Sequence, residues 1–244
     1  MQFKPRWRIV PVSPPILIVA LYCFLLSANY YYASRAAYLL ERIRVLKADD
    51  SSIEELKRIG AEPGFRYTVP SHLPCANSLP CAYIVSPNNG WMRSLLLPLA
   101  QTNLGRHTGL KAWEVWGFIL ADGEGRTSKG YVLVILTGSY FPETQVSVSE
   151  QHHSEYNSCI YRPLKRHPGY EIHRASNFRS LRAIVSDGAS EENRRRAFHF
   201  SLDCLTSRSP CDQLSEIIPS VWIDYESDLA WVEQHPGEHD PQCE

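Results

Sequence analysis

The strongest constraint in this sequence is an apolar segment close to the N-terminus. A head of three basic residues precedes the segment, and no charged residue follows until Arg35. As a helix, the stretch from Ile16 to Ala33 would measure about 27 Å at roughly 1.5 Å per residue, which is just enough to cross a bilayer core. Trp7 and Tyr30 to Tyr32 flank it, as amphipathic rings do at the two membrane–water interfaces. The sequence therefore predicts a transmembrane helix.

A cleaved signal peptide is the alternative interpretation of the same segment. The core from Ile16 to Leu26 has a suitable length for one, and Leu26-Ser27-Ala28 is a usable cleavage site. The flanking aromatic residues and the sufficient length favour an uncleaved anchor instead. We therefore predict a basic head and membrane anchor at residues 1–33, in a chain that is directed to a membrane in either case.

Two short amphipathic helices are expected to follow, at residues 34–62. Apolar residues recur at helical spacing between Leu39 and Leu46, which predicts that the helix continues beyond the anchor. In the next stretch, Ser51 with Glu54, or Ser52 with Glu55, has the spacing of a capping box, in which each side chain bonds a backbone N–H at the start of the helix.

Residues 63–233 are interpreted as an α+β domain built around an antiparallel sheet. Two apolar runs, Trp113–Leu120 and Tyr131–Leu136, flank the polar loop DGEGRTSKG and so predict a central hairpin. We expect about five to seven strands, near the usual size of a sheet. Weaker strand patterns occur at residues 146–149, 170–173, 181–186 and 198–204, and a short exposed helix is expected at 189–197. Residues 234–244 are predicted to form a flexible polar tail.

The cysteines indicate on which side of the membrane this domain lies. Four of the seven form two closely spaced pairs, Cys75 with Cys81 and Cys204 with Cys211. Cys204 is expected at the end of a strand, and Cys211 in the first turn of a helix that begins at Ser209 and stops at Pro219. Such a turn can bring two Cα atoms within the reach of a disulfide. Structural disulfides would place the domain outside the cytoplasm.

Two other interpretations of these pairs stay open. A thiol at a helix N-terminus has a lowered pKa, which suits a redox pair, but the spacing differs from that of thioredoxin-like motifs. A zinc site would need a C-x-x-C or matching histidine spacing that the sequence lacks. Structural disulfides explain both pairs at once, whereas Cys159 and Cys243 can pair with each other or stay free.

Charge and histidines supply weaker candidates. The net charge of −1 gives no support for nucleic-acid binding. Basic residues gather in the second half of the chain, where solvated faces are the simpler interpretation. The alternative is a patch for an anionic lipid or polysaccharide, formed by Arg162, Lys165, Arg166, Arg194, Arg195 and Arg196. His235 and His239 are weak metal candidates in the tail, and we predict neither a metal nor a cofactor.

No pattern of a hydrolase, metalloprotease or nucleotide-binding loop occurs in the sequence. We therefore expect a protein of the inner cell membrane with an extracytoplasmic domain that binds or organises an envelope partner of unknown identity. The bilayer itself would be a second partner, through the N-terminal helix. The alternative is an envelope hydrolase whose site is assembled from scattered residues. A deep polar cleft with a buried carboxylate or histidine would favour the enzyme, and a shallow apolar patch would favour the binding protein.

Overall fold

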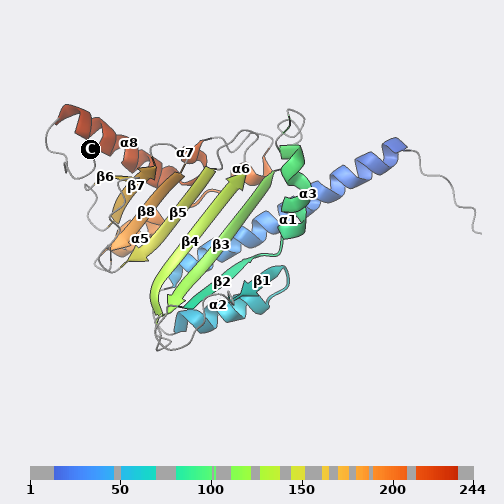
Figure 1. The fold of residues 1–244 in the computed structure, drawn as a ribbon, viewed down its shortest axis with the longest axis horizontal. Coiled ribbons are helices and arrows are strands. Elements are labelled where there is room, and N and C mark those ends of the chain that lie inside the picture. Colours follow the sequence, from blue (N-terminus) through green and yellow to red (C-terminus); the bar gives the residue numbers. More distant parts are fainter. Residues whose placement is uncertain are drawn as a thin grey trace, which may run out of the picture.

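The described part of the chain forms one eight-stranded sheet with a long N-terminal helix across it (Figure 1). This computed structural model describes residues 14–46, 51–69, 81–100, 102, 111–121, 127–137, 144–151, 161–164, 170–175, 180–186, 189–207 and 213–235. The predicted mixture of helices and sheet, with a long apolar helix at the N-terminus, is confirmed within these residues.

The sheet is larger than predicted, and it is not wholly antiparallel. Its strands are β1 (Phe65–Thr68), β2 (Cys81–Pro87), β3 (Ala112–Ala121), β4 (Thr127–Thr137), β5 (Thr144–Gln151), β6 (Tyr161–Leu164), β7 (Tyr170–Ala175) and β8 (Ser180–Ser186). Their order is β1-β2-β3-β4-β5-β8-β7-β6. All neighbours are antiparallel except β5 and β8. The parallel pair arises because the chain leaves β5, restarts at the far edge as β6 and returns strand by strand to β8.

The central hairpin is confirmed as β3 and β4, with Val115 opposite Val134. Side chains of β3 alternate between the two faces of the sheet, as the pleat requires. Trp113 and Val115 are fully buried in the main core, whereas Trp116 and Phe118 on the other face are half-buried. These two rings pack edge to face, with their centroids 5.8 Å apart.

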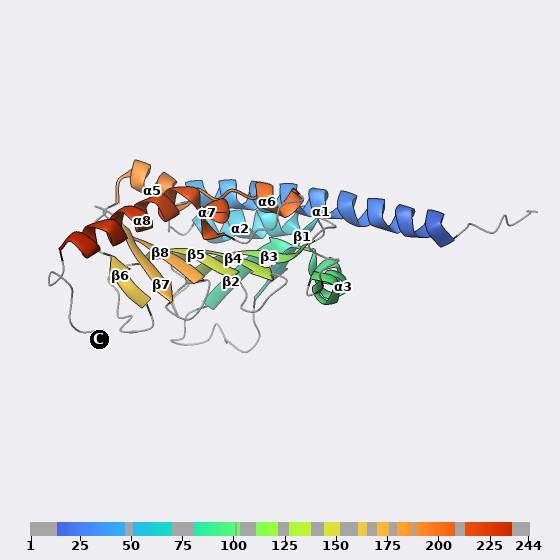
Figure 2. The ribbon, with the colours of Figure 1, turned by 90° about the horizontal axis from the view of Figure 1, so that it is seen from above.

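Helices cover one face of this sheet (Figure 2). They are α1 (Pro14–Val45), α2 (Ser51–Ala61), α5 (Glu191–Ala197), α6 (Asp203–Thr206), α7 (Leu214–Ile217) and α8 (Pro219–Gln234). Helix α3 (Gly90–Ala100) lies instead at the end of the sheet from which α1 projects. The main core forms where the helical layer meets the sheet, and it includes side chains from α1, α2, α8 and the inner strands.

Helix α1 is a single unbroken helix whose first part is exposed and whose later part packs against the sheet. Its buried positions begin at Leu25 and recur at spacings of three or four residues as far as Ile43, so one stripe of the helix faces the sheet. Gly117 of β3 lies directly beneath it, because a side chain there would collide with Ile43. The helix crosses residue 33, the predicted end of the anchor, without a break. The predicted domain borders stay predictions.

Helix α2 is held on α1 by a small network of charges. Glu55 accepts hydrogen bonds from Arg58 of its own helix, at 2.7 Å, and from Arg42 of α1. The bond from Arg58, joined by that from Arg42, lowers the pKa of Glu55 below its ordinary value. The ionised form of this carboxyl is therefore favoured in the folded chain.

We predict that Glu55→Gln destabilises the domain at neutral pH but not in acid. A carboxyl whose pKa is lowered on folding contributes stability above its unfolded pKa of about 4.3, and the contribution is lost as pH falls through the folded value. At pH 7 the variant should melt about 1–4 °C below the wild-type chain, and the difference should shrink steadily as pH falls below about 4.3. Glu54→Gln is the matched control, because Glu54 is exposed and pairs with Lys57. A difference that persists in acid would contradict this account.

The segment after α5 differs from the prediction. Helix α5 itself is confirmed, and Ser190 caps it by accepting the N–H of Asn193 at 3.2 Å. Residues 198–204 were expected to form a strand, but residues 198–202 do not join the sheet, and Asp203 begins helix α6. Their alternate apolar residues, Phe198 and Leu202, are indeed buried. The segment packs in the helical layer instead, where the N–H of Ser201 donates to Ile217.

The structure also corrects the surroundings of Cys204. This residue lies in the short helix α6, not at the end of a strand. The expected start of the next helix at Ser209 and Pro210 falls outside the described residues. The helix expected to stop at Pro219 does end just before it, as α7 at Ile217. Pro219 then occupies the first position of α8, where its missing N–H costs no helical hydrogen bond.

Candidate functional site

The first part of α1 exposes apolar side chains on every side. Six of them, Ile16, Leu17, Ile18, Val19, Leu21 and Phe24, are each 55–68% exposed. Soluble surfaces rarely carry a continuous apolar patch of this kind. Among the described residues, α1 is the one helix that is long and apolar enough to cross a membrane.

Helix α3 continues this exposed surface. One of its stripes, Met92 and Leu96, is buried against Leu25 of α1. The next stripe, Trp91, Leu95 and Leu99, faces outward and is 45%, 49% and 39% exposed. An outward stripe on a soluble helix normally carries polar residues. Here two adjoining stripes of α3 are apolar, of which only one is buried by the protein.

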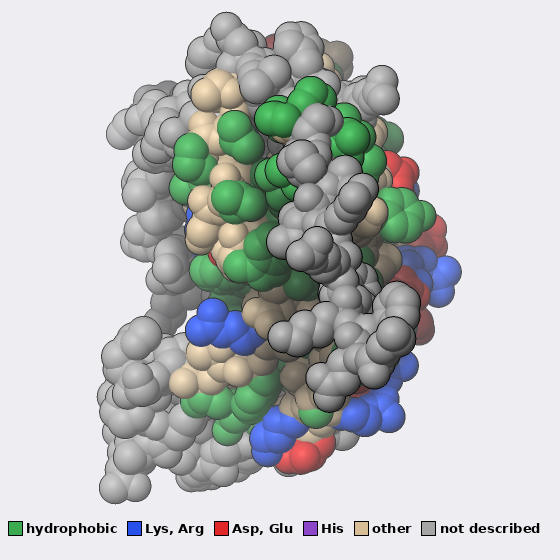
Figure 3. All heavy atoms as spheres, turned by 90° about the vertical axis from the view of Figure 1, so that its right-hand side faces the viewer, with side chains coloured by type: hydrophobic (Ala, Val, Ile, Leu, Met, Phe, Trp, Pro, Cys, Tyr) green, Lys and Arg blue, Asp and Glu red, His purple; other side chains and the backbone are tan. Residues whose placement is uncertain are grey.

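We call the exposed side chains of both helices the apolar end: Ile16, Leu17, Ile18, Val19, Leu21, Phe24, Trp91, Leu95 and Leu99. Figure 3 views the molecule from the side on which they lie; hydrophobic side chains gather in the upper part of this view, and most charged ones lie toward its margins. The ring of Trp91 joins the two helices, because it lies 6.1 Å from the ring of Phe24. Its Nε1–H also donates to the Tyr32 hydroxyl at 3.2 Å.

A buried asparagine fixes α1 to the domain just beyond the apolar end. Asn29 is 2% exposed, and its side chain bonds in two directions. Its Nδ2 donates to the carbonyl of Leu205 in α6 at 2.7 Å, and its Oδ1 accepts the indole N–H of Trp113 in β3 at 2.8 Å. Both bonds are shielded from water, where an unmatched polar group is costly. The orientation of α1 is therefore defined by polar geometry as well as by apolar packing.

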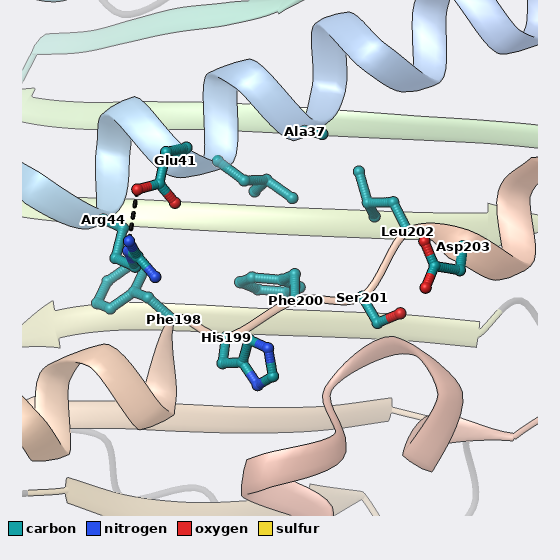
Figure 4. A pocket seen from close by; sticks show the side chains of 10 residues that line it. Ala37, Glu41, Arg44, Phe198, His199, Phe200, Ser201, Leu202 and Asp203 are labelled. Atoms are coloured by element: carbon teal, nitrogen blue, oxygen red, sulfur yellow. Dashed lines mark hydrogen bonds and ion pairs between the residues drawn. The ribbon is translucent and has the colours of Figure 1, made fainter.

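A hollow of about 340 Å³ lies between α1 and residues 198–203 (Figure 4). Helix α1 contributes Glu41 and Arg44, which form an ion pair with each other at 2.5 Å. His199 lines the hollow, and its Nδ1 lies 2.9 Å from the hydroxyl of Ser220. Within the described residues this histidine has no carboxylate partner to orient it, as the base of a catalytic triad would need. Asp224 and Asp228 are buried carboxylates, but neither lines the hollow.

The predicted cysteine sites are only partly within the described residues. Cys204 is buried and disulfide-bonded. No two described cysteines are joined to each other, so the second sulfur of this bond is not among the described side chains. The pairing of Cys204 with Cys211 stays a prediction, and so does that of Cys75 with Cys81. Cys81 is the first residue of β2. Cys75, Cys159, Cys211 and Cys243 lie outside the described residues, and Cys23 is free and exposed on α1.

Two arginines of the predicted basic patch bond other groups of the same domain. Arg194 donates to the carbonyls of Arg44, at 3.2 Å, and Leu46, and so caps the C-terminus of α1. Burial lowers the pKa of Arg194 below its ordinary value. Arg196 pairs with the buried Asp224 at 2.5 Å, whereas Arg195 is exposed. Arg162 lies in β6, and Lys165 and Arg166 fall outside the described residues.

The weak metal candidates at the C-terminus are not brought together. His235 ends the described part of the chain, and its ring stacks on Trp231 with centroids 4.4 Å apart. His239 lies outside the described residues. No group of three or more histidine, cysteine, aspartate or glutamate side chains in the described ranges has a metal-binding arrangement.

Comparison with protein-family models, curated proteins and solved structures finds no match for this chain. The apolar end is the feature that points most directly to an interaction, because it combines exposure with a chemistry that water does not favour. The part of it that lies on helix α3 is not predicted from the sequence patterns. A signal is nevertheless present in GWMRSLLLPLA, where apolar residues recur at helical spacing around a single arginine.

Proposed function

We propose that this chain is a single-pass membrane protein whose α+β domain lies outside the cytoplasm and binds or organises a partner close to the membrane. One observation carries the proposal. The same helix that exposes the apolar end continues as a core element of the domain, with its stripe from Leu25 to Ile43 buried. A helix of this kind holds the domain at the membrane without a flexible linker.

The packing of α1 favours an uncleaved anchor over a signal peptide. Cleavage after Ala28 would remove Leu25, which is buried against Met92 and Leu96. It would also create a charged α-amino group on Asn29, whose side chain is bonded inside the domain. Placing a charge beside such a buried site is costly unless a partner is supplied. The folded domain therefore depends on residues that a signal peptidase would remove.

The disulfide at Cys204 supports the extracytoplasmic side. Disulfides persist in oxidising compartments and are rare in the cytosol. A binding role is preferred to hydrolysis because Glu41 and Arg44 pair with each other at the hollow. The other carboxylate there, Asp203, is exposed, whereas catalytic carboxyl groups are typically desolvated. The partner would be an envelope protein or an anionic envelope component that meets the domain at a fixed height above the bilayer.

The test of this proposal is a topology measurement on the full chain. Alkaline phosphatase, which is active only outside the cytoplasm, should be active when fused after Glu244, and a fluorescent reporter that matures only in the cytoplasm should stay dark there. The same two reporters placed before Met1 should give the opposite result and serve as the matched control. Carbonate washing should leave the full-length chain in the membrane pellet.

Two results would count against the proposal. A cytoplasmic reporter that is bright after Glu244 would place the domain on the wrong side. A mature product that begins near Asn29 would show that the N-terminal segment is a signal peptide and not an anchor.

A further inference from the structure

We infer that α3 is a second membrane-contacting element, whose stripe of Trp91, Leu95 and Leu99 lies in the lipid headgroup region beside α1. This inference rests on the proposed function, because it takes α1 as the anchor. It adds that the domain itself touches the bilayer, through a helix that does not cross it. The ligand of the apolar end is accordingly the lipid surface.

The exposed part of α1 is short compared with the thickness of a bilayer. From Pro14 to Phe24 the helix rises about 16 Å, roughly half of a bilayer core of about 30 Å. Beyond Phe24 the helix is already packed against the domain, beginning at Leu25. The apolar side chains of α1 can reach lipid only if the domain lies directly against the membrane. Phe24 would then be at or below the level of the headgroups.

Helices α1 and α3 are in direct contact with each other. Trp91 touches Phe24 through its ring and Tyr32 through its indole N–H. Leu25 packs in one cluster with Met92 and Leu96. Helix α3 is therefore attached to α1 at the level where α1 leaves the bilayer. Tryptophan and tyrosine are enriched at this depth, because one end of each ring is apolar and the other is polar.

The direction of α3 relative to α1 also suits a helix that lies at a membrane surface. Figure 1 shows α3 along its length, and Figure 2 shows it almost end-on, whereas α1 runs across both views. Helix α3 therefore crosses α1 steeply. If α1 follows the bilayer normal, α3 runs more across that direction than along it, as interfacial helices do.

The charge on α3 is also turned away from the proposed lipid contact. Arg93 is the one charged residue in GWMRSLLLPLA, and its guanidinium lies 3.4 Å from Glu114 of β3. This pairing draws the charge toward the sheet and leaves the outward stripe apolar. A lipid surface is favoured over a protein partner because the stripe is continuous with the exposed side chains of α1, and one planar surface can cover both.

Photo-crosslinking of the full-length chain tests the inference. The photoreactive residue p-benzoylphenylalanine replaces Leu95, Val19 or Ile223, one position at a time, in vesicles of phosphatidylcholine and phosphatidylglycerol that contain an alkyne-tailed phospholipid. Ile223 is the matched control, because it is 63% exposed on α8, far from the apolar end. We expect lipid labelling at Leu95 and Val19 to exceed that at Ile223 by about tenfold, as acyl-chain contact implies.

Each outcome separates the inference from the proposed function. Labelling at Val19 but not at Leu95 would overturn the role of α3 and leave the anchor intact. Crosslinking of Leu95 to a second copy of the chain, without lipid labelling, would show that a protein covers the stripe. Absence of labelling at Val19 would contradict the anchor itself.

A second measurement needs no photoreactive residue. Lipids brominated on their acyl chains quench only tryptophans that reach them. The quenchable part of the fluorescence should fall in Trp91→Phe, while Trp222→Phe on α8 should leave it unchanged. Equal quenching in the wild-type chain and Trp91→Phe would also overturn the inference.

Discussion

Asn29→Ala should lower the free energy of unfolding by about 2–4 kcal/mol, because it leaves two buried polar groups without partners. These groups are the indole N–H of Trp113 and the carbonyl of Leu205, which bond Asn29 at 2.8 and 2.7 Å. Urea unfolding of the full chain in detergent micelles, followed by tryptophan fluorescence, measures the change. The loss should appear as a lower midpoint with an unchanged slope, since the surface exposed on unfolding is the same.

Ser27→Ala is the matched control for this substitution. Ser27 lies two residues away on the same helix, is exposed and donates only to the carbonyl of Cys23 at 2.8 Å within that helix. Its replacement should change stability by less than about 0.5 kcal/mol, as is usual for surface sites. Equal midpoints for the two variants would mean that Asn29 does not fix α1 to the domain.

Replacing Cys204 and Cys211 together by serine should lower the melting temperature by about 2–8 °C. Closing a loop of this size removes unfolded-state entropy worth roughly 2–3 kcal/mol, and such a loss shifts the melting temperature of a domain by several degrees. Cys204 is buried beside the contacts of α6 with α1. The fold should survive, because its apolar core lies elsewhere as well.

Cys23→Ser is the control, because Cys23 is free and exposed; it should leave the melting temperature unchanged. Peptide mapping of the unreduced chain should show the peptide of Cys204 linked to that of Cys211. A link to another cysteine would refute this pairing, and a free thiol at Cys204 would remove both the bond and its support for an oxidising compartment.

The elements that could be predicted from sequence carry their own local signals. Helix α2 has an amphipathic pattern and a polar start, and α5 has Ser190 as its cap. The hairpin of β3 and β4 has two long apolar runs around a polar loop. Two such runs that are close in the chain typically pair with each other as a hairpin. In each case the residues that decide the structure are within a few positions of one another.

The elements that were missed depend on distant partners. Residues 198–202 alternate like a strand, but they pack in the helical layer, where the N–H of Ser201 donates to Ile217, a partner that lies outside the segment and outside the sheet. The parallel contact of β5 with β8 follows from the return path through β6 and β7, which no local pattern encodes. Asn29 occurs within an apolar run, and only the fold brings Trp113 and Leu205 to it. The α3 part of the apolar end was missed for the same reason, since α3 meets α1 only in three dimensions.

If α1 is the membrane anchor, its unbroken course couples the orientation of the whole domain to the bilayer. The helix has 32 residues, or about 48 Å at 1.5 Å each, so a tilt of about 10° about its membrane end would swing the other end by about 8 Å. Helices tilt by such amounts to match the thickness of the surrounding lipid. Because Asn29 bonds α1 to Leu205 of α6 and to Trp113 of β3, the domain would tilt together with the helix. A thinner or thicker membrane would thus re-aim the domain and change which neighbours in the envelope it can reach.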